Sequence, residues 1–117
     1  MPLLQDPDRL AAYRDALGNW AITDYIRFEL PERAQRWINV ELGYLSSREI
    51  GRLMNEYVEA GGEIDEVRER GEYDFEFHYD LRFTINDKPV YIETRLDYRP
   101  PFVPDEPSII VVNIHAP

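Results

Sequence analysis

An uninterrupted alternation of apolar and polar side chains from Tyr73 to Ile85 is the feature that most constrains how this chain folds. The odd-numbered positions of this run are aromatic or aliphatic, and the even-numbered positions are charged or polar. Because successive side chains of a β-strand point to opposite faces, this period predicts one long strand with a buried face. A polar turn at Asn86–Pro89 and a second alternating run from Val90 to Tyr98 follow. Together the two runs predict a β-hairpin.

Charge favours one register for this hairpin. Opposed side chains of unlike charge stabilise a strand pair, whereas like charges destabilise it. Placing Asp87-Lys88 at the tip gives three favourable cross-strand pairs: Arg82/Glu93, Asp80/Arg95 and His78/Asp97. A slip of two residues places Asp80 against Glu93, which are both acidic. We therefore expect the first register.

The first half of the chain carries helix signals. Asp6-Pro7 is typical of an N-cap followed by a proline at the first helical position, and this helix should end before Gly18. The segment from Ser46 to Glu49 has the capping-box pattern, and an apolar stripe at helical spacing follows it up to Gly61-Gly62. Both patterns predict helices that bury one face.

The segment between these two helices is harder to interpret. From Trp20 to Leu30 helical and alternating patterns conflict, and a helix is the preferred interpretation. Pro31 should end that element and begin another helix, which runs to Gly43. Alternating apolar residues between Ile38 and Leu42 leave a strand open there as well.

The end of the chain predicts one more strand, Ser108 to His115. Ile110, Val112 and Ile114 should lie on the face opposite Ile109, Val111, Asn113 and His115. The four prolines between Arg99 and Pro107 indicate a rigid connector, with a distant similarity to a proline-rich docking motif. We expect one α+β domain over residues 1–117, in which helices from 6–60 pack on one face of a three- or four-stranded antiparallel sheet formed by 73–115.

Composition limits the classes of function. With 13 basic and 23 acidic residues the net charge is -10, which argues against a general nucleic-acid binder and suits a basic protein partner. Eight acidic residues gather between Glu59 and Glu76, where only Arg68 and Arg70 are basic, and we interpret this run as a solvated linker or face. The absence of cysteine excludes disulfides and thiolate chemistry. No signal peptide or membrane span is recognisable, so a cytoplasmic location is expected.

The polar side of the predicted sheet contains the residues that could perform chemistry. If the three strands are neighbours, this face gathers His78, Asp80, Arg82, Glu93, Arg95, Asn113 and His115. A metal-independent ribonuclease needs a general base, a general acid and cations for the phosphate. Glu93 or His78 would be the base and His115 the acid, with Arg82 and Arg95 as the phosphate clamp. The structural alternative is a solvated face held together by cross-strand ion pairs.

A metal site is a further alternative on this face. His78, Asp80, Glu93 and His115 are acceptable ligands, but their spacing is not diagnostic of any metal motif. No metal site and no cofactor is therefore assigned from the sequence.

Three blocks of the chain resemble the C-terminal half of uncharacterised small bacterial proteins: Phe77–Arg82, Val90–Leu96 and Val111–Ala116. That resemblance implies no activity. The order of helices followed by a sheet is also loosely similar to that of microbial ribonucleases and ribonuclease-type toxins, from which the strong acidity departs.

Two hypotheses about function follow. The leading one is a non-enzymatic interaction domain whose acidic surface, centred on Glu63 to Glu76, binds a basic protein or a second copy of the chain. The alternative is a small metal-independent hydrolase of RNA that uses His78, Glu93, Arg95 and His115, with Arg82, on the polar sheet face.

Overall fold

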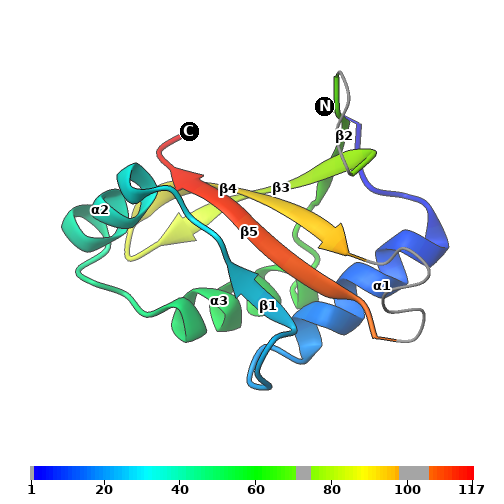
Figure 1. The fold of residues 1–117 in the computed structure, drawn as a ribbon, viewed down its shortest axis with the longest axis horizontal. Coiled ribbons are helices and arrows are strands. Elements are labelled where there is room, and N and C mark those ends of the chain that lie inside the picture. The colour runs from blue at the N-terminus through cyan, green and yellow to red at the C-terminus, as the bar shows by residue number, and fades with distance from the viewer. Residues whose placement is uncertain (1, 71–74, 98–105) are drawn as a thin grey trace.

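A computed structural model describes residues 2–70, 75–97 and 106–117. The elements in chain order are α1 (Pro7–Gly18), β1 (Ile26–Phe28), α2 (Glu32–Glu41), α3 (Ser47–Glu59), β2 (Asp65–Arg68), β3 (Phe77–Ile85), β4 (Lys88–Asp97) and β5 (Ser108–His115). The strands form one sheet in the order β1-β5-β4-β3-β2 (Figure 1). The predicted α+β fold is confirmed, with the helices in the first half of the chain.

The sheet is larger than the sequence predicted and is not fully antiparallel. Its three central strands, β3, β4 and β5, pair antiparallel as expected, and β2 adds to β3 in the same sense. β1 pairs parallel with β5 at the opposite edge, which makes the sheet mixed and five-stranded.

The capping residues predicted from the sequence cap their helices in the structure. The Asp6 side chain accepts a hydrogen bond from the backbone N–H of Arg9 at 2.9 Å and caps α1. The Ser46 side chain accepts one from the backbone N–H of Glu49 at 3.1 Å and caps α3. Each cap satisfies an N–H that has no partner inside its own helix.

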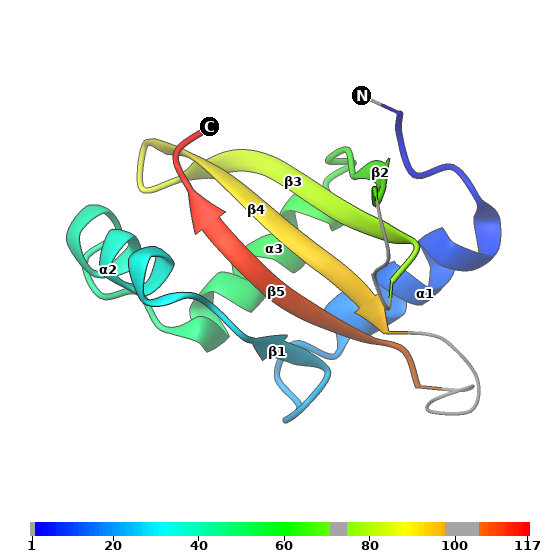
Figure 2. The ribbon, with the colours of Figure 1, turned by 45° about the horizontal axis from the view of Figure 1, so that its top comes forward.

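The hydrophobic core lies between the sheet and the helices α1 and α3, which cover the same sheet face (Figure 2). The odd-numbered side chains of β3 and the even-numbered ones of β4 point into it, as the alternation predicted. The largest fully buried side chains of this core include Tyr13 and Leu17 from α1, Ile50 and Met54 from α3, and Leu81, Ile92 and Ile109 from the sheet. The sheet face away from α1 and α3 is called the polar face below.

The prediction of a helix between Trp20 and Leu30 is wrong. Turns follow α1, and Ile26–Phe28 then forms β1. Two backbone hydrogen bonds fix this strand to β5, from the N–H of Ile109 to the carbonyl of Tyr25 and from the N–H of Glu29 to the carbonyl of Val111. A partner more than 80 residues away thus decides between two patterns that are balanced locally.

The acidic run is also more structured than a solvated linker. Asp65–Arg68 forms the edge strand β2, which pairs with β3. The N-terminal segment lies beside it, because Glu66 donates its backbone N–H to Pro2 and Leu4 donates its own to Ile64, each at 2.8 Å. The strand expected from Tyr73 begins only at Phe77, and its first two expected residues, 73 and 74, lie outside the described residues. Most of the proline-rich connector, residues 99–105, lies outside them as well.

The charge-matched hairpin register is wrong, and the structure adopts the alternative shifted by two residues. Asn86-Asp87 forms the two-residue loop, and both residues have positive φ, at 50° and 66°. Positive φ at both central positions is the mark of the turn whose twist matches that of the strands. Asn and Asp tolerate this conformation far better than Lys does, and the charge-matched register would place Lys88 at the second central position. Turn geometry therefore outweighs cross-strand charge, and Asp80 lies opposite Glu93.

A β-bulge changes which side chains of β5 share a face. The pairing with β4 shifts between Asn113, which lies opposite Glu93, and Val111, which lies opposite Thr94, so Val112 is the additional residue. The predicted strict alternation over β5 is therefore wrong. The bulge lets Ile109, Val111 and Ile114 all enter the core, while Asn113 and His115 point to the polar face.

None of the helices in the described part of the chain is long and apolar enough to cross a membrane.

Candidate functional site

A row of carboxylates crosses the polar face from β2 to β4. The strand register places Asp65 beside Asp80, Asp80 beside Glu93, and Glu93 beside Asn113 of β5. Neighbouring strands are about 4.8 Å apart, so these side chains are close neighbours. The row exists because of the turn-dictated register, since the charge-matched register would have placed Asp80 opposite Arg95.

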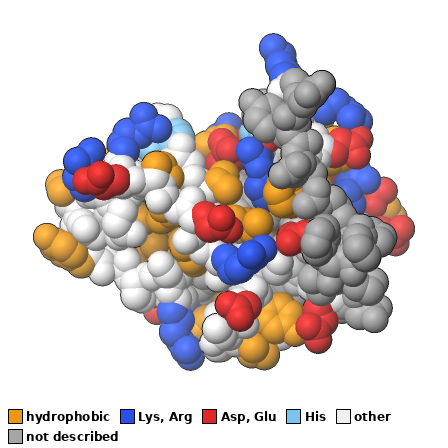
Figure 3. Space-filling model, viewed as in Figure 1, with side chains coloured by type: hydrophobic (Ala, Val, Ile, Leu, Met, Phe, Trp, Pro, Cys, Tyr) orange, Lys and Arg blue, Asp and Glu red, His pale blue; other side chains and the backbone are white. Residues whose placement is uncertain are grey.

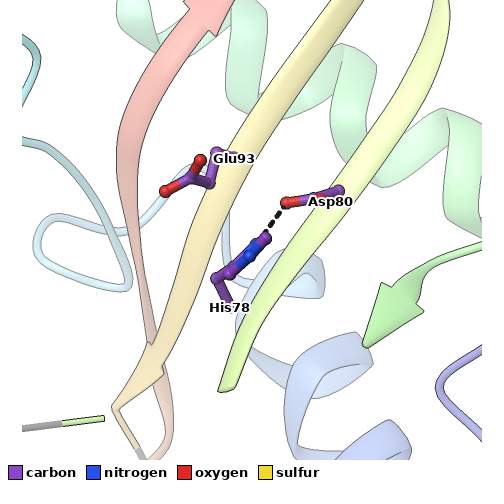
Figure 4. Close-up of side chains that lie close together, drawn as sticks. All are labelled: His78, Asp80 and Glu93. Carbon is purple, nitrogen blue, oxygen red and sulfur yellow. Dashed lines mark hydrogen bonds and ion pairs between the residues drawn. The ribbon is translucent and has the colours of Figure 1, made fainter. Parts of the chain in front are cut away.

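His78 and Asp80 form a hydrogen-bonded pair on this row. They are two residues apart on β3, so both side chains point to the polar face, and His78 Nδ1 lies 2.8 Å from Asp80 Oδ1 (Figure 4). The Asp80 side chain is fully buried, and that of His78 is 16% exposed. A carboxylate at Nδ1 fixes the orientation of the ring and leaves Nε2 free for another partner.

The other carboxylate oxygen of Asp80 is in an unusual position. Oδ2 is buried and has no hydrogen-bond partner among residues 2–70, 75–97 and 106–117. The phenol of Tyr91 interacts with the same carboxylate: burial, and then a hydrogen bond to Asp80 and the charge of Asp80, raise the pKa of its hydroxyl. A buried carboxylate oxygen without a hydrogen bond lowers the free energy of unfolding, because its lost contacts with water are not replaced. Most buried polar groups avoid this cost.

Glu93 and Arg95 continue the site on β4. The Glu93 carboxylate points toward β5 in Figure 4, and its Oε2 lies 3.7 Å from Arg95 Nη2. Arg95 forms its closer ion pair with Glu69, which follows β2. Arg95 is therefore shared between two carboxylates, and Glu93 has no cation of its own among the described residues.

The remaining two predicted site residues lie one row further along, on either side of Tyr91. The Arg82 guanidinium carbon is 4.9 Å from the centre of the Tyr91 ring, and Arg82 pairs with Asp65. The exposed His115 ring stacks on Tyr91 with 4.7 Å between ring centres, and its Nδ1 lies 2.6 Å from the carbonyl of Ala116. Standard strand spacings place His115 about 16 Å from His78, measured along four residues and across two strands.

The structure thus brings His78, Glu93 and Arg95 together and leaves Arg82 and His115 flanking Tyr91. Tyr91 and Glu69 are members of the site to which the sequence analysis gave no role, and Asp80 was considered there only as a cross-strand partner of Arg95 and as an acceptable metal ligand. The signal for Tyr91 was available, because it alternates with Glu93 and Arg95 on the polar side of β4. Glu69 could not have been found, because it lies beyond β2 and reaches Arg95 only through the fold.

Most of the acidic residues of the run that the structure describes, 59–70 and 76, are neutralised within the chain. Four of its carboxylates form ion pairs with arginines: Asp65 with Arg82, Glu66 with Arg9, Glu69 with Arg95, and Glu76 with Arg68. Arg9 binds both oxygens of Glu66, at 2.7 and 2.9 Å. In Figure 3 acidic and basic side chains alternate over the visible surface rather than separating into fields of one sign.

Comparisons with other proteins provide no family for this chain: no family model, no curated protein and no solved structure matches it.

Proposed function

We propose that this protein is a small hydrolase that cleaves RNA on the polar face without a metal, with His78 as the general base. The hydrogen bond of 2.8 Å between His78 and the buried Asp80 supports this proposal. A general base needs a defined tautomer and a fixed direction, and a buried carboxylate at one ring nitrogen provides both. His78 Nε2 then accepts the proton of the attacking 2′-hydroxyl, whose oxygen forms a bond to phosphorus while the bond from phosphorus to the 5′-oxygen breaks, and the leaving oxygen takes a proton from solvent.

The cations for the phosphate come from the same face. Arg95 lies on β4 beside the acidic row, and Arg82 lies one row away. Both are paired with carboxylates in the free protein. A phosphate would replace those partners, because a guanidinium binds phosphate with two hydrogen bonds as readily as it binds a carboxylate.

His115 belongs to a different arrangement. At about 16 Å from His78 it is too far to act on the same phosphodiester, since acid and base must each lie within hydrogen-bond distance of the reacting group. Glu93 is one strand and two residues from His115, at about 8 Å. His115 therefore remains a predicted general acid only for a reaction in which Glu93 is the base.

Variants of the two histidines distinguish these arrangements. Cleavage of a mixed panel of fluorescent RNA oligonucleotides should be measured in EDTA. If His78 is the base, His78→Ala should lower the rate by about 10²–10⁴-fold while His115→Ala retains it. Thr84→Ala, on the exposed part of the same strand, is the matched control. Inactive wild-type protein on all RNAs would contradict the proposal, and loss in His115→Ala alone would favour the Glu93 arrangement.

The acidity of the chain gives this activity an unusual dependence on salt. A net charge of -10 repels RNA at long range, and the Debye length falls from about 30 Å at 0.01 M to about 10 Å at 0.1 M salt. We expect kcat/KM to rise over that range. A basic nuclease would show a fall, because salt weakens its attraction to RNA.

The interaction-domain hypothesis stays a prediction. The in-chain ion pairs of the acidic run leave less free charge for a basic partner than the sequence indicated. Light scattering and pull-downs over a salt series test it directly. A chain that is monomeric at every salt concentration and captures no basic protein would exclude it.

A further inference from the structure

We propose that His78, Asp80 and Glu93 form a binding site for a divalent transition-metal ion such as Zn²⁺. One potential ligand atom from each side chain lies within 4.8 Å of the other two. The three residues come from adjacent strands, β3 and β4, so the sheet backbone holds them in place (Figure 4). Sites on regular elements are more rigid than sites on loops.

The unpartnered oxygen of Asp80 is a separate indication of a ligand. The Asp80 side chain is completely buried, its Oδ1 lies 2.8 Å from His78 Nδ1, and its Oδ2 has no hydrogen bond of regular geometry among the described residues. The Tyr91 hydroxyl, whose pKa Asp80 raises, is a neutral neighbour that does not compensate the charge of this carboxylate. A buried carboxylate oxygen is normally satisfied by an N–H, an O–H or a cation. A cation between Asp80, His78 and Glu93 would provide the missing interaction.

The charge balance of the polar face points to the same place. Among the described residues, each of the three arginines of this face makes its closest ion pair with a different carboxylate: Arg27 with Asp97, Arg82 with Asp65, and Arg95 with Glu69. Asp80 has no arginine partner among them, and Glu93 has only the longer contact of 3.7 Å with Arg95. Asp80 and Glu93 lie directly opposite each other in the register. One divalent cation would neutralise these two carboxylates and relieve the repulsion between them.

The chemistry of the ligands selects the kind of ion. One imidazole nitrogen with two carboxylates suits Zn²⁺ or Mn²⁺, whereas Ca²⁺ requires six to eight oxygens. Two ligands of a tetrahedral Zn²⁺ are about 3.3 Å apart at bond lengths near 2.0 Å. The 2.8 Å between His78 Nδ1 and Asp80 Oδ1 is close to this value. The Glu93 carboxylate would rotate from its direction toward β5, and solvent would complete the shell.

This inference does not rest on the proposed hydrolase activity, because cation binding is measured without RNA. The two are nevertheless linked through His78. A metal at Nδ1 would displace the Asp80 hydrogen bond that orients the ring as a base, so bound Zn²⁺ should slow the cleavage seen in EDTA.

Calorimetric titration of the untagged full chain with ZnCl₂ tests the site. We expect one Zn²⁺ per chain and a higher Tm in its presence. His78→Gln, Asp80→Asn and Glu93→Gln should each weaken binding at least tenfold. Two matched controls should bind as the wild type does: His115→Gln removes the other histidine, and Asp65→Asn removes a carboxylate of the same row that Arg82 already neutralises.

Two results would overturn the proposal. The first is no Zn²⁺ binding by wild-type protein, and the second is binding that survives Glu93→Gln or is lost in His115→Gln. Glu93 is only partly buried, so Glu93→Gln is expected to fold even if Asp80→Asn does not. Circular dichroism of each variant identifies a folding failure. Cleavage in EDTA with no Zn²⁺ binding would refute this site and leave the hydrolase proposal intact. Zn²⁺ binding without any cleavage of RNA would refute the hydrolase proposal and leave the site intact.

Discussion

The two faces of the β3–β4 hairpin differ in whether their buried polar groups have hydrogen-bond partners. On the core face Thr94 is fully buried, and its hydroxyl donates to the carbonyl of Tyr79 at 2.7 Å while Tyr13 bonds to it at 2.8 Å. Because the Thr94 proton is already used, the Tyr13 hydroxyl is the donor. On the polar face Asp80 is buried almost as deeply, yet Oδ2 has no hydrogen-bond partner among the described residues.

Within this one hairpin, the core face contributes to stability and the polar face carries the candidate site. The core network is closed, and each of its members contributes to a single packed arrangement. The polar face keeps two opposed carboxylates that no arginine neutralises individually, an arrangement with no benefit to folding. Uncompensated charge of this kind is more common at functional sites than elsewhere.

The largest difference in the free energy of unfolding should come from truncating one side chain on each face of β3. Leu81 is fully buried, so Leu81→Ala should lower the free energy of unfolding by about 2–5 kcal/mol. Thr84 is exposed on the polar face, and Thr84→Ala should change it by no more than about 0.5 kcal/mol. Urea denaturation of both variants measures the difference. Equal effects would mean that the polar face is packed like the core.

Removing one hydrogen bond from the buried network of Tyr13, Thr94 and Tyr79 should have an intermediate effect on the free energy of unfolding. Tyr13→Phe removes one buried hydrogen bond and should cost about 1 kcal/mol. Burial raises the pKa of the Tyr13 hydroxyl, so folding favours the neutral phenol. The resulting stability is fully present below the unfolded value of about 10 and is lost as the pH rises above it. Denaturation between pH 8 and pH 11 should therefore show a smaller alkaline loss in Tyr13→Phe than in the wild type.

Two substitutions in the turn that sets the register should change the free energy of unfolding in opposite directions. Asp87 has a φ of 66°, which glycine adopts without strain and alanine does not. Asp87→Gly should raise the free energy of unfolding by about 0.5 kcal/mol, and Asp87→Ala should lower it by about 1 kcal/mol. Thermal denaturation of the pair provides the measurement. The same sign in both variants would argue against the Asn86-Asp87 loop.

The smallest effect should come from the opposed carboxylates themselves. Glu93→Gln removes a like charge opposite Asp80 and should raise the free energy of unfolding by about 0.5 kcal/mol in the absence of metal. The increase should shrink at high salt, because Glu93 is only partly buried. A decrease in stability would show that the contact with Arg95 outweighs the repulsion.

Much of the candidate site followed from the sequence, but its pairing did not. The alternation along β3 and β4 placed His78, Glu93 and Arg95 on one face, and the structure brings them together. Charge complementarity then suggested that each acidic group had its own cation. That reasoning failed because a cross-strand ion pair contributes less than about 1 kcal/mol, while an unsuitable turn strains the backbone directly.

The sequence by itself determined the elements whose signals are local. The capping residues Asp6 and Ser46, the period of two along the hairpin and the strand Ser108–His115 all depend on neighbours within a few residues, and all appear in the structure. Only the tertiary structure decided that Ile26–Phe28 is a strand, that a bulge puts Ile109 and Val111 on the core face rather than with Asn113 and His115, and that Asp80 lies opposite Glu93. Each of these depends on hydrogen bonds between strands or on the fit of a turn to its strands, which the pattern of side-chain types does not encode.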